Sequence, residues 1–340
     1  MSVTAARKRP AATPNIATSI FSAVPAQPGR TFDGPRSIAG RASTSRSRLF
    51  LRPRFSLGFT GQQWYTYTPA YNSVASGGKL TLTHRSSQYT SWSASLTSEH
   101  DVSSITDLAF NDPKLRTTLI ALGLDPTTRA QRGNLNALGA DFEHSTADSP
   151  LNPHRGFSIA LHVEEAGRLV PGSFNYYAAS FDGRQYLRMT DNIVFASRVQ
   201  AGNIRPIGNN PANVPFGKKY FLGGATSIRG WGRYEVGPLV SGQPIGGNSM
   251  FAFSEELRAT VRGRLSGVMF IDAGNVWAGS GAFNLRDLRY AVGPGLRYET
   301  PVGPLRFDLG YQLNPTPDLI VNGNPQRWPL RLHFSIGQAF

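Results

Sequence analysis

Hydrophobic and polar residues alternate along most of the chain from Arg48 onwards. This period of two is typical of β-strands that present one apolar face and one polar face. The clearest stretch is Leu305–Leu313, in which apolar side chains alternate with Arg306, Asp308, Gly310 and Gln312. Asp101–Thr127 is the least clear region, because Asp107–Leu122 could equally hold a short helix. About fourteen segments have the strand pattern: Arg48–Thr60, Trp64–Tyr71, Lys79–His84, Tyr89–Glu99, Arg116–Leu124, Asn134–Glu143, Phe157–Glu165, Phe174–Leu187, Asn192–Gly202, Ser249–Val261, Gly267–Trp277, Arg289–Thr300, Leu305–Leu313 and Leu330–Phe340.

The connections between these segments alternate between short ones, such as Pro301–Pro304, and long ones, such as Arg205–Asn248. No apolar run approaches the roughly 18 residues of a membrane helix. Strands that cross a membrane need an apolar side chain only at every second position. We therefore predict an all-β, transmembrane antiparallel β-barrel. The alternative is a soluble sandwich with one wet face, but so many strands with a polar second face favour a closed barrel.

Composition divides the chain into two parts. Residues 1–47 are rich in Ala, Pro, Ser, Thr and Arg without any period, so we predict a disordered or misassigned amino terminus, with the barrel domain at 48–340. Residues 1–54 hold ten of the 35 basic residues but one of the 21 acidic ones, without a nucleic-acid-binding module, so no nucleic-acid partner is expected. Ile16–Val24 is too weakly apolar for a secretory signal, which suggests a truncated start. Without Cys, no disulfide or thiol chemistry is expected.

The segment Lys218–Pro238, K-K-Y-F-L-G-G-A-T-S-I-R-G-W-G-R-Y-E-V-G-P, is too rich in glycine for a helix and too irregular for a strand. Long ordered loops in compact folds are usually functional. Arg229 stands between Ile228 and Gly230-Trp231, and a guanidinium can hold a carboxylate through two parallel bonds. We expect Gly223, Gly224 and Gly230 to let this loop bend and approach the barrel wall.

Two acidic residues on consecutive strands could lie within reach of one cation. Glu256 shares its parity with Ser254 and Arg258, and Asp272 shares its parity with Gly274, so both carboxylates point to the inner face. Glu255 falls on the lipid-facing parity, where a carboxylate is costly, so we expect it near a rim or at a bulge.

Enzymatic chemistry finds little support in the sequence. The six histidines are scattered without metal-ligand spacing, and neither a nucleophile elbow nor a phosphate-binding loop is present. We therefore expect no catalytic residue, no metal and no cofactor. A Ser-His pair assembled only in three dimensions, as in an outer-membrane phospholipase barrel, is an alternative that this pattern leaves open.

F-L-G-G-A-T-S-I-R-G-W resembles the signature loop of the BamA/TamA superfamily of outer-membrane assembly proteins, the bacterial surface antigen barrel. The matching residues are Gly223, Gly224, Ile228, Arg229, Gly230 and Trp231, with Trp in place of the family's Phe or Tyr. The family's E-L-R and F-x-D-x-G motifs correspond to Glu256–Arg258 and Phe270–Gly274, and Ser149–Gly156 is similar to the turn before the second half of its barrel. The resemblance implies a sixteen-stranded barrel in the bacterial outer membrane, with the loop folded into the lumen and its Arg paired with an acid.

The end of the chain supports the same resemblance. Phe334, Ile336 and Phe340 alternate with polar residues, similar to the carboxy-terminal signal of outer-membrane barrels. In the family, the first and last strands pair weakly at a seam, which here implies Arg48–Thr60 against Leu330–Phe340, weakened by Gly337. The implied function is insertion of other outer-membrane proteins without ATP or covalent catalysis.

The alternative function is a passive pore or a two-partner-secretion-type channel, since those transporters share an Arg-Gly-aromatic loop. The implied partners are outer-membrane lipid, client barrel or secreted proteins and periplasmic accessory proteins, around a monomeric barrel. Family members carry periplasmic domains before the barrel. Residues 1–47 are too few for one, which puts client capture by this chain in doubt.

Overall fold

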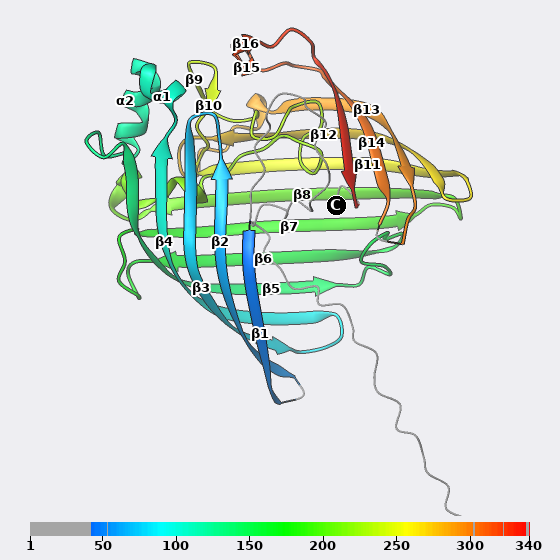
Figure 1. Cartoon of the computed structure of the whole chain (residues 1–340). Helices are drawn as coiled ribbons and strands as arrows, with labels where there is room; N and C mark the ends of the chain where they lie inside the picture. Colours follow the sequence, from blue (N-terminus) through cyan, green and yellow to red (C-terminus); the bar gives the residue numbers. More distant parts are fainter. Residues whose placement is uncertain (1–41, 53, 302, 322, 338–339) are drawn as a thin grey trace, which may run out of the picture.

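A single curved antiparallel sheet makes up most of the computed structural model, which describes residues 42–52, 54–301, 303–321, 323–337 and 340. The sheet has 13 strands in the order β1-β2-β3-β4-β5-β6-β7-β8-β11-β12-β13-β14-β17, so consecutive long strands are neighbours. It curls until its first and last strands, β1 and β17, both lie at the front of the molecule (Figure 1). This arrangement confirms the predicted all-β antiparallel barrel, and we call the inner face of the sheet the lumen.

The strands of the main sheet are β1 (Ala42–Arg52), β2 (Phe55–Tyr67), β3 (Tyr71–Arg85), β4 (Thr90–Ile105), β5 (Ala130–Ser145), β6 (Gly156–Ala166), β7 (Tyr176–Arg188), β8 (Ile193–Pro206), β11 (Ser249–Arg262), β12 (Leu265–Trp277), β13 (Arg289–Tyr298), β14 (Leu305–Gln312) and β17 (Leu330–Ile336). Two short hairpins, β9–β10 (Leu239–Val240 and Gln243–Pro244) and β15–β16 (Ile320–Val321 and Asn324–Pro325), lie in long connections. The 3₁₀ turns are η1 (Ile207–Asn209), η2 (Pro211–Asn213), η3 (Phe216–Lys218) and η4 (Leu285–Asp287).

The described part of the main sheet holds 13 strands, against 14 counted from the sequence and 16 implied by the resemblance. The segment Arg48–Thr60, expected as one strand, is instead part of the antiparallel hairpin β1–β2, in which Leu49 lies opposite Leu57. A proline at position 53 interrupts this segment, and proline cannot donate to a strand ladder. β1 also begins at Ala42, before the predicted boundary at Arg48, while residues 1–41 of the predicted disordered terminus lie outside the described residues.

The stretch between β4 and β5 forms two short helices, α1 (Asp107–Asn111) and α2 (Pro113–Ala121), so the strand expected at Arg116–Leu124 is wrong and the helical alternative is correct. Thr106 caps α1 by accepting from the backbone N–H of Ala109. Asp112 caps α2 by accepting from that of Leu115 at 2.9 Å, ahead of a proline at the first helical position. Apolar residues of the helices pack on Tyr71 and Phe216 at one rim of the barrel.

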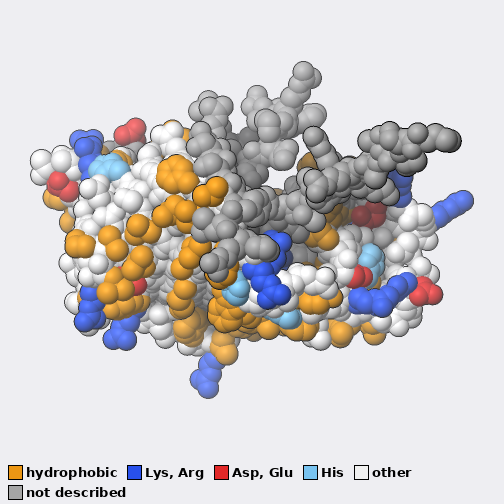
Figure 2. All heavy atoms as spheres, turned by 90° about the horizontal axis from the view of Figure 1, so that it is seen from below, with side chains coloured by type: hydrophobic (Ala, Val, Ile, Leu, Met, Phe, Trp, Pro, Cys, Tyr) orange, Lys and Arg blue, Asp and Glu red, His pale blue; other side chains and the backbone are white. Residues whose placement is uncertain are grey.

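The two faces of the sheet differ as the alternation predicts. Large apolar side chains such as Phe59, Trp92 and Met269 are exposed on the outside, and rows of hydrophobic side chains cross the face seen in Figure 2. Charged side chains such as Glu256 and Asp308 are buried on the inside. Among the described residues, no helix is long and apolar enough to cross a membrane.

Glu255 corrects one expectation about the outer face. It lies in the middle of β11, in regular register with Ser197 of β8 and Ile271 of β12, rather than at a rim or a bulge. Its carboxylate accepts a hydrogen bond of 2.6 Å from the hydroxyl of Ser197. A polar neighbour on the adjacent strand therefore replaces the water that a rim position would provide.

The two edges of the sheet are β1 and β17. Within the described residues, β1 pairs with β2 and β17 pairs with β14, and no pairing joins β1 to β17. The predicted edge Arg48–Thr60 therefore shifts to Ala42–Arg52, and the predicted edge Leu330–Phe340 ends at Ile336.

Candidate functional site

The connection between β8 and β11 folds back over the lumen rather than outward. Its course is set by two isolated bridges, Tyr220 with Gly247 and Leu222 with Val236. Residues 218–238 of this connection are called the lumenal loop below. Ile228 and Trp231 are fully buried, and Arg229 is 1% exposed. The loop therefore fills part of the barrel interior with a tightly packed irregular segment.

Glycine makes the tip of this loop possible. Gly223 has a φ of +105° and Gly230 a φ of +94°, which lie in the region that other residues rarely adopt. A Cβ on Gly223 would collide with the carbonyl oxygen of Gly232. The backbone N–H of Gly224 donates to the carbonyl of Trp231 at 3.1 Å and closes the tip.

The structure brings Arg229 together with both acids selected from the sequence. The Nε and Nη2 atoms of Arg229 each lie 2.7 Å from the carboxylate of Asp272, and its backbone N–H donates to the same carboxylate at 2.9 Å. Its Nη1 atom binds Glu256, and its guanidinium carbon lies 3.5 Å from the centre of the Phe270 ring. Glu256 and Asp272 are both fully buried.

Electrostatics favour the charged state of this guanidinium. Burial alone lowers the pKa of Arg229, but the negative charges of Asp272 and Glu256 raise it well above its usual range. A buried cation held by two carboxylates is costly to break, because removing either side leaves an unpaired buried charge. The pairing therefore fixes the loop strongly in one position.

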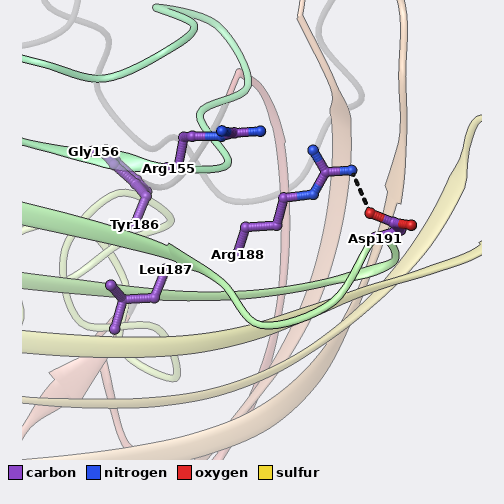
Figure 3. A pocket seen from close by; sticks show the side chains of 6 residues that line it. All are labelled: Arg155, Gly156, Tyr186, Leu187, Arg188 and Asp191. Atoms are coloured by element: carbon purple, nitrogen blue, oxygen red, sulfur yellow. Dashed lines mark hydrogen bonds and ion pairs between the residues drawn. The ribbon is translucent and has the colours of Figure 1, made fainter.

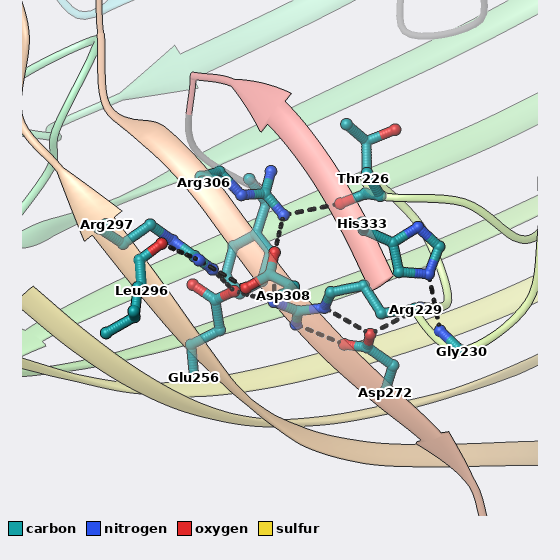
Figure 4. Close-up of polar contacts among 12 residues, drawn as sticks. Thr226, Arg229, Gly230, Glu256, Asp272, Leu296, Arg297, Arg306, Asp308 and His333 are labelled. Atoms are coloured by element: carbon teal, nitrogen blue, oxygen red, sulfur yellow. Dashed lines mark hydrogen bonds and ion pairs between the residues drawn. The ribbon is translucent and has the colours of Figure 1, made fainter. Parts of the chain in front are cut away.

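The ion pair belongs to a larger network that sequence reasoning missed (Figure 4). Arg258 and Arg297 both bind Glu256, at 2.8 and 3.4 Å, and Arg297 and Arg306 bind Asp308. With Arg229 and Asp272, four guanidiniums and three carboxylates are buried together. All of these wall residues have lumenal parity, so the alternation in the sequence predicts that they point inward. The alternation does not predict which of them meet across the lumen.

The residues after Arg229 attach the lumenal loop to β14 and β17. Gly230 donates its N–H to Nε2 of His333 at 3.0 Å and accepts from the side-chain amide of Gln312 at 2.6 Å. The indole N–H of Trp231 donates to the hydroxyl of Thr316 at 3.1 Å. Arg229 and Gly230 therefore have polar contacts with barrel strands, and Trp231 has one with the connection that follows β14.

The first residues of the loop form a second anchor on another part of the wall. The ammonium of Lys218 lies 3.1 Å from the carboxylate of Glu164 on β6, which also accepts from the hydroxyl of Tyr176 at 2.6 Å. Burial alone lowers the pKa of Lys218, but Glu164 and other nearby acids raise it above its usual range. Among the described residues, the ammonium of the neighbouring Lys219 has one hydrogen-bond partner, the amide oxygen of Asn248 at 2.7 Å, and burial lowers the pKa of Lys219 to about 8.

The end of the chain differs from the predicted pattern. Phe334 and Ile336 are exposed on the outer face of β17 as expected. Gly337 comes directly after the strand with a φ of +96°, a conformation that favours glycine, and ends it rather than weakening it from within. Phe340 is 6% exposed instead of facing lipid, because its ring lies 5.4 Å from the guanidinium carbon of Arg258 and packs with Tyr186 and Ala196.

A separate cavity of about 460 Å³ lies at the end of β7 and the start of β6 (Figure 3). Its lining contains one ion pair, between Arg188 and Asp191 at 3.0 Å, and both partners are solvent-accessible. No residue of the Arg229 network lines it. Among the described residues, no group of three or more His, Asp or Glu side chains is arranged to hold a metal ion.

Comparison with known proteins agrees with this architecture. The model of the Omp85 superfamily domain matches residues 32–340. The outer membrane protein assembly factor BamA of Neisseria meningitidis is 26% identical over 366 residues, which cover 91% of this chain and 44% of that protein. A sorting and assembly machinery component 50 homolog of Xenopus laevis is 26% identical over 188 residues, covering 54% of this chain and 39% of that protein.

Among solved structures, BamA of Haemophilus ducreyi lacking POTRA domains 1–3 superimposes with a TM-score of 0.68. The superposition covers 88% of this chain and 60% of that chain at 16% identity, so the likeness concerns the fold. The chain spans less than half the length of the curated relatives it matches.

Proposed function

Since this chain belongs to the Omp85 superfamily, we propose that its barrel helps to insert or translocate other outer-membrane proteins. Both curated relatives described above carry assembly in their names. The chain would act in the bacterial outer membrane as a monomeric barrel. Its partners would be the surrounding lipid, client proteins and periplasmic accessory proteins. The work requires neither ATP nor a covalent intermediate, because it consists of lowering the barrier to strand pairing within a membrane.

One observation carries this proposal: the sheet ends in two strands, β1 and β17, that each have one pairing partner among the described residues. An unpaired strand edge presents a row of backbone N–H and C=O groups. An incoming strand can add to such an edge by main-chain hydrogen bonds, which is the physical basis of β-augmentation. In the hydrocarbon region, where water offers no substitute partners, this pairing is especially favourable.

The Arg229 ion pair would keep the lumenal loop docked while the edge strands β1 and β17 pair with a client strand. Asp272 and Glu256 lie on β12 and β11, which are three and four steps from the edge strand β17 in the sheet order and have neighbours on both sides. Anchoring the loop there holds its tip against the stable part of the wall. We therefore assign Arg229, Glu256 and Asp272 a structural role in the insertion-competent barrel.

The proposal is tested with purified protein in liposomes and a small unfolded outer-membrane barrel as client. The folded client is detected by its heat-modifiable mobility on a gel. We expect the protein to accelerate folding over empty liposomes, and Arg229→Ala to reduce that acceleration by about tenfold or more, because breaking a buried pair costs about 3–5 kcal/mol. Arg188→Ala, which removes an exposed ion pair, serves as the matched control and should change little. Client folding no faster than in empty liposomes would refute the proposal.

The alternative, a passive pore or a secretion channel, is separated by ion conductance in planar bilayers. A barrel filled by the lumenal loop should conduct poorly and unevenly. Large, steady unitary steps from the unmodified protein, together with no effect on client folding, would favour the pore.

A further inference from the structure

The last strand, β17, is short and held on one side. Its seven residues pair with β14 from Leu330 opposite Tyr311 to Ile336 opposite Leu305. Its other edge has no strand partner in the described part of the chain. A short strand with one neighbour should fray readily, since fewer backbone bonds hold it. Any further contact with β17 therefore decides how stable this edge is.

The lumenal loop supplies two such contacts from inside the barrel. The N–H of Gly230 donates to Nε2 of His333 at 3.0 Å, and Glu235 binds the guanidinium of Arg331 at 2.9 Å. Both wall residues belong to β17 and both point into the lumen (Figure 4 shows His333). Glu235 also accepts from the N–H of Gly232 at 2.7 Å, which fixes its carboxylate within the loop.

The loop backbone lies directly on the β14–β17 pair. Gly310 of β14 is opposite Arg331, and a Cβ at Gly310 would collide with the backbone of Arg229 and Gly230. Asp308, on the same strand and opposite His333, belongs to the Arg229 network through Arg297 and Arg306. The loop thus binds β11 and β12 through Arg229 and the edge strand β17 through the following residue, Gly230.

The chemistry of the His333 contact is specific. Because Nε2 accepts a hydrogen bond, it carries no proton, so the neutral ring holds its proton on Nδ1. A glutamine at this position offers an amide oxygen that can accept the same bond. A leucine keeps a similar bulk but offers no acceptor.

We propose that His333 and Arg331 are positioning residues through which the docked loop holds the edge strand β17, so that docking of the loop and exposure of this edge are coupled. This inference rests on the proposed function only in treating β17 as the edge offered to clients. Undocking the loop at Arg229 would release β17 without any change in β17 itself. Conversely, a client strand that pulls β17 outward would strain the loop.

Hydrogen exchange of the whole protein in detergent micelles or nanodiscs, read by mass spectrometry on a peptide covering β17, tests the coupling. We expect His333→Leu to accelerate exchange in β17 by about three- to tenfold, the range for one lost hydrogen bond. His333→Gln should restore slow exchange. Arg229→Ala, on a different element, should also accelerate exchange in β17. His100→Leu is the matched control, since it removes a 2.7 Å bond to Asn134 on a paired strand far along the sheet.

The decisive measurement is the double variant Arg229→Ala/His333→Leu. If both changes act through the loop, β17 in the double variant should exchange no faster than in Arg229→Ala alone. Unchanged exchange in Arg229→Ala, or effects that multiply in the double variant, would overturn the coupling. If Arg229→Ala does not fold into a heat-modifiable barrel, Gln312→Leu is used in its place. This change removes the hydrogen bond from Gln312 to the carbonyl of Gly230 and so loosens the loop from β14. These readouts need no client, so failure of the coupling is distinct from failure of the insertion activity.

Discussion

Replacing Gly310 with alanine separates docking of the lumenal loop from the charge network that holds it. Gly310 lies on the lumenal face of β14, where a Cβ would stand 2.8 Å from the carbonyl carbon of Arg229 and from the Cα of Gly230, and closer still to the N of Gly230. Gly310 does not have a positive φ, so alanine fits its backbone. The change adds one methyl group and removes no charge or donor.

The size of the effect can be worked out from the distances. Ordinary contacts of a Cβ begin at 3.4 Å, so the loop must move away by between about 0.5 and 1 Å. This movement lengthens the bonds from Gly230 to His333 and from Gln312 to Gly230, now 3.0 and 2.6 Å. Two hydrogen bonds at about 1 kcal/mol each give about 2 kcal/mol, or roughly thirtyfold in the docking equilibrium.

Hydrogen exchange of a peptide covering the lumenal loop measures this equilibrium. We expect Gly310→Ala to lower the protection of the loop by roughly thirtyfold and to speed exchange in β17, while the strands that precede β14 in the sheet keep their protection. Gly267→Ala is the matched control, because the nearest atom to its Cβ would be a methyl carbon of Val261 at 3.9 Å. Protection of the loop within about threefold of the unmodified protein would refute the steric reasoning, since about 1.4 kcal/mol already corresponds to tenfold.

Three further predictions concern separate contacts. Arg229→Lys keeps the positive charge but loses the planar guanidinium that binds Asp272 and Glu256 together. The protection of the loop against hydrogen exchange should therefore fall, but less than in Arg229→Ala, and equal losses in both variants would contradict this. Burial lowers the pKa of Lys219 from 10.5 to about 8 when the loop is docked. Between these two values the undocked loop keeps a proton on Lys219 that the docked loop has lost, so docking should strengthen as the pH rises from about 8 towards 10.5. Lys219→Met should abolish this change in protection factors, and a change that persists would exclude Lys219 as its source. Asp112→Ala removes the cap of α2 and should cost about 1 kcal/mol locally, seen as faster exchange in α2 alone; unchanged exchange there would argue against the cap.

The alternation of the sequence predicted where side chains point better than where strands end. Phe307 and Leu309 face outward and Asp308 faces inward, as their parity requires, and the same rule placed Glu256 and Asp272 on one face. Parity needs only the backbone period and is therefore a local property. The end of a strand depends instead on the conformation and contacts of the residues beyond it. Phe340 fits the period of β17 but turns inward after Gly337 to pack near Arg258, a residue 82 positions earlier.

The rest of the network could not be obtained from the sequence, because it depends on contacts across the lumen. Arg297, Arg306 and His333 all have inward parity, but parity does not give the height of a side chain along the barrel. That height is set by the stagger between neighbouring strands. The contact of Gly230 with His333 joins positions 103 residues apart and leaves no local trace.

The lumenal loop also acts as a mechanical brace. It is tied to β6 through Lys218 and Glu164 and to β17 through Glu235 and Arg331. These two strands are seven steps apart in the sheet order, or about 34 Å of wall at about 4.8 Å per strand. The cross-section of the barrel therefore cannot widen much between these strands unless an ion pair at one end of the loop breaks or the folded loop itself unravels. A barrel that opens at its edge while this brace holds must do so by bending the last strands, and the rest of its circumference stays stiff.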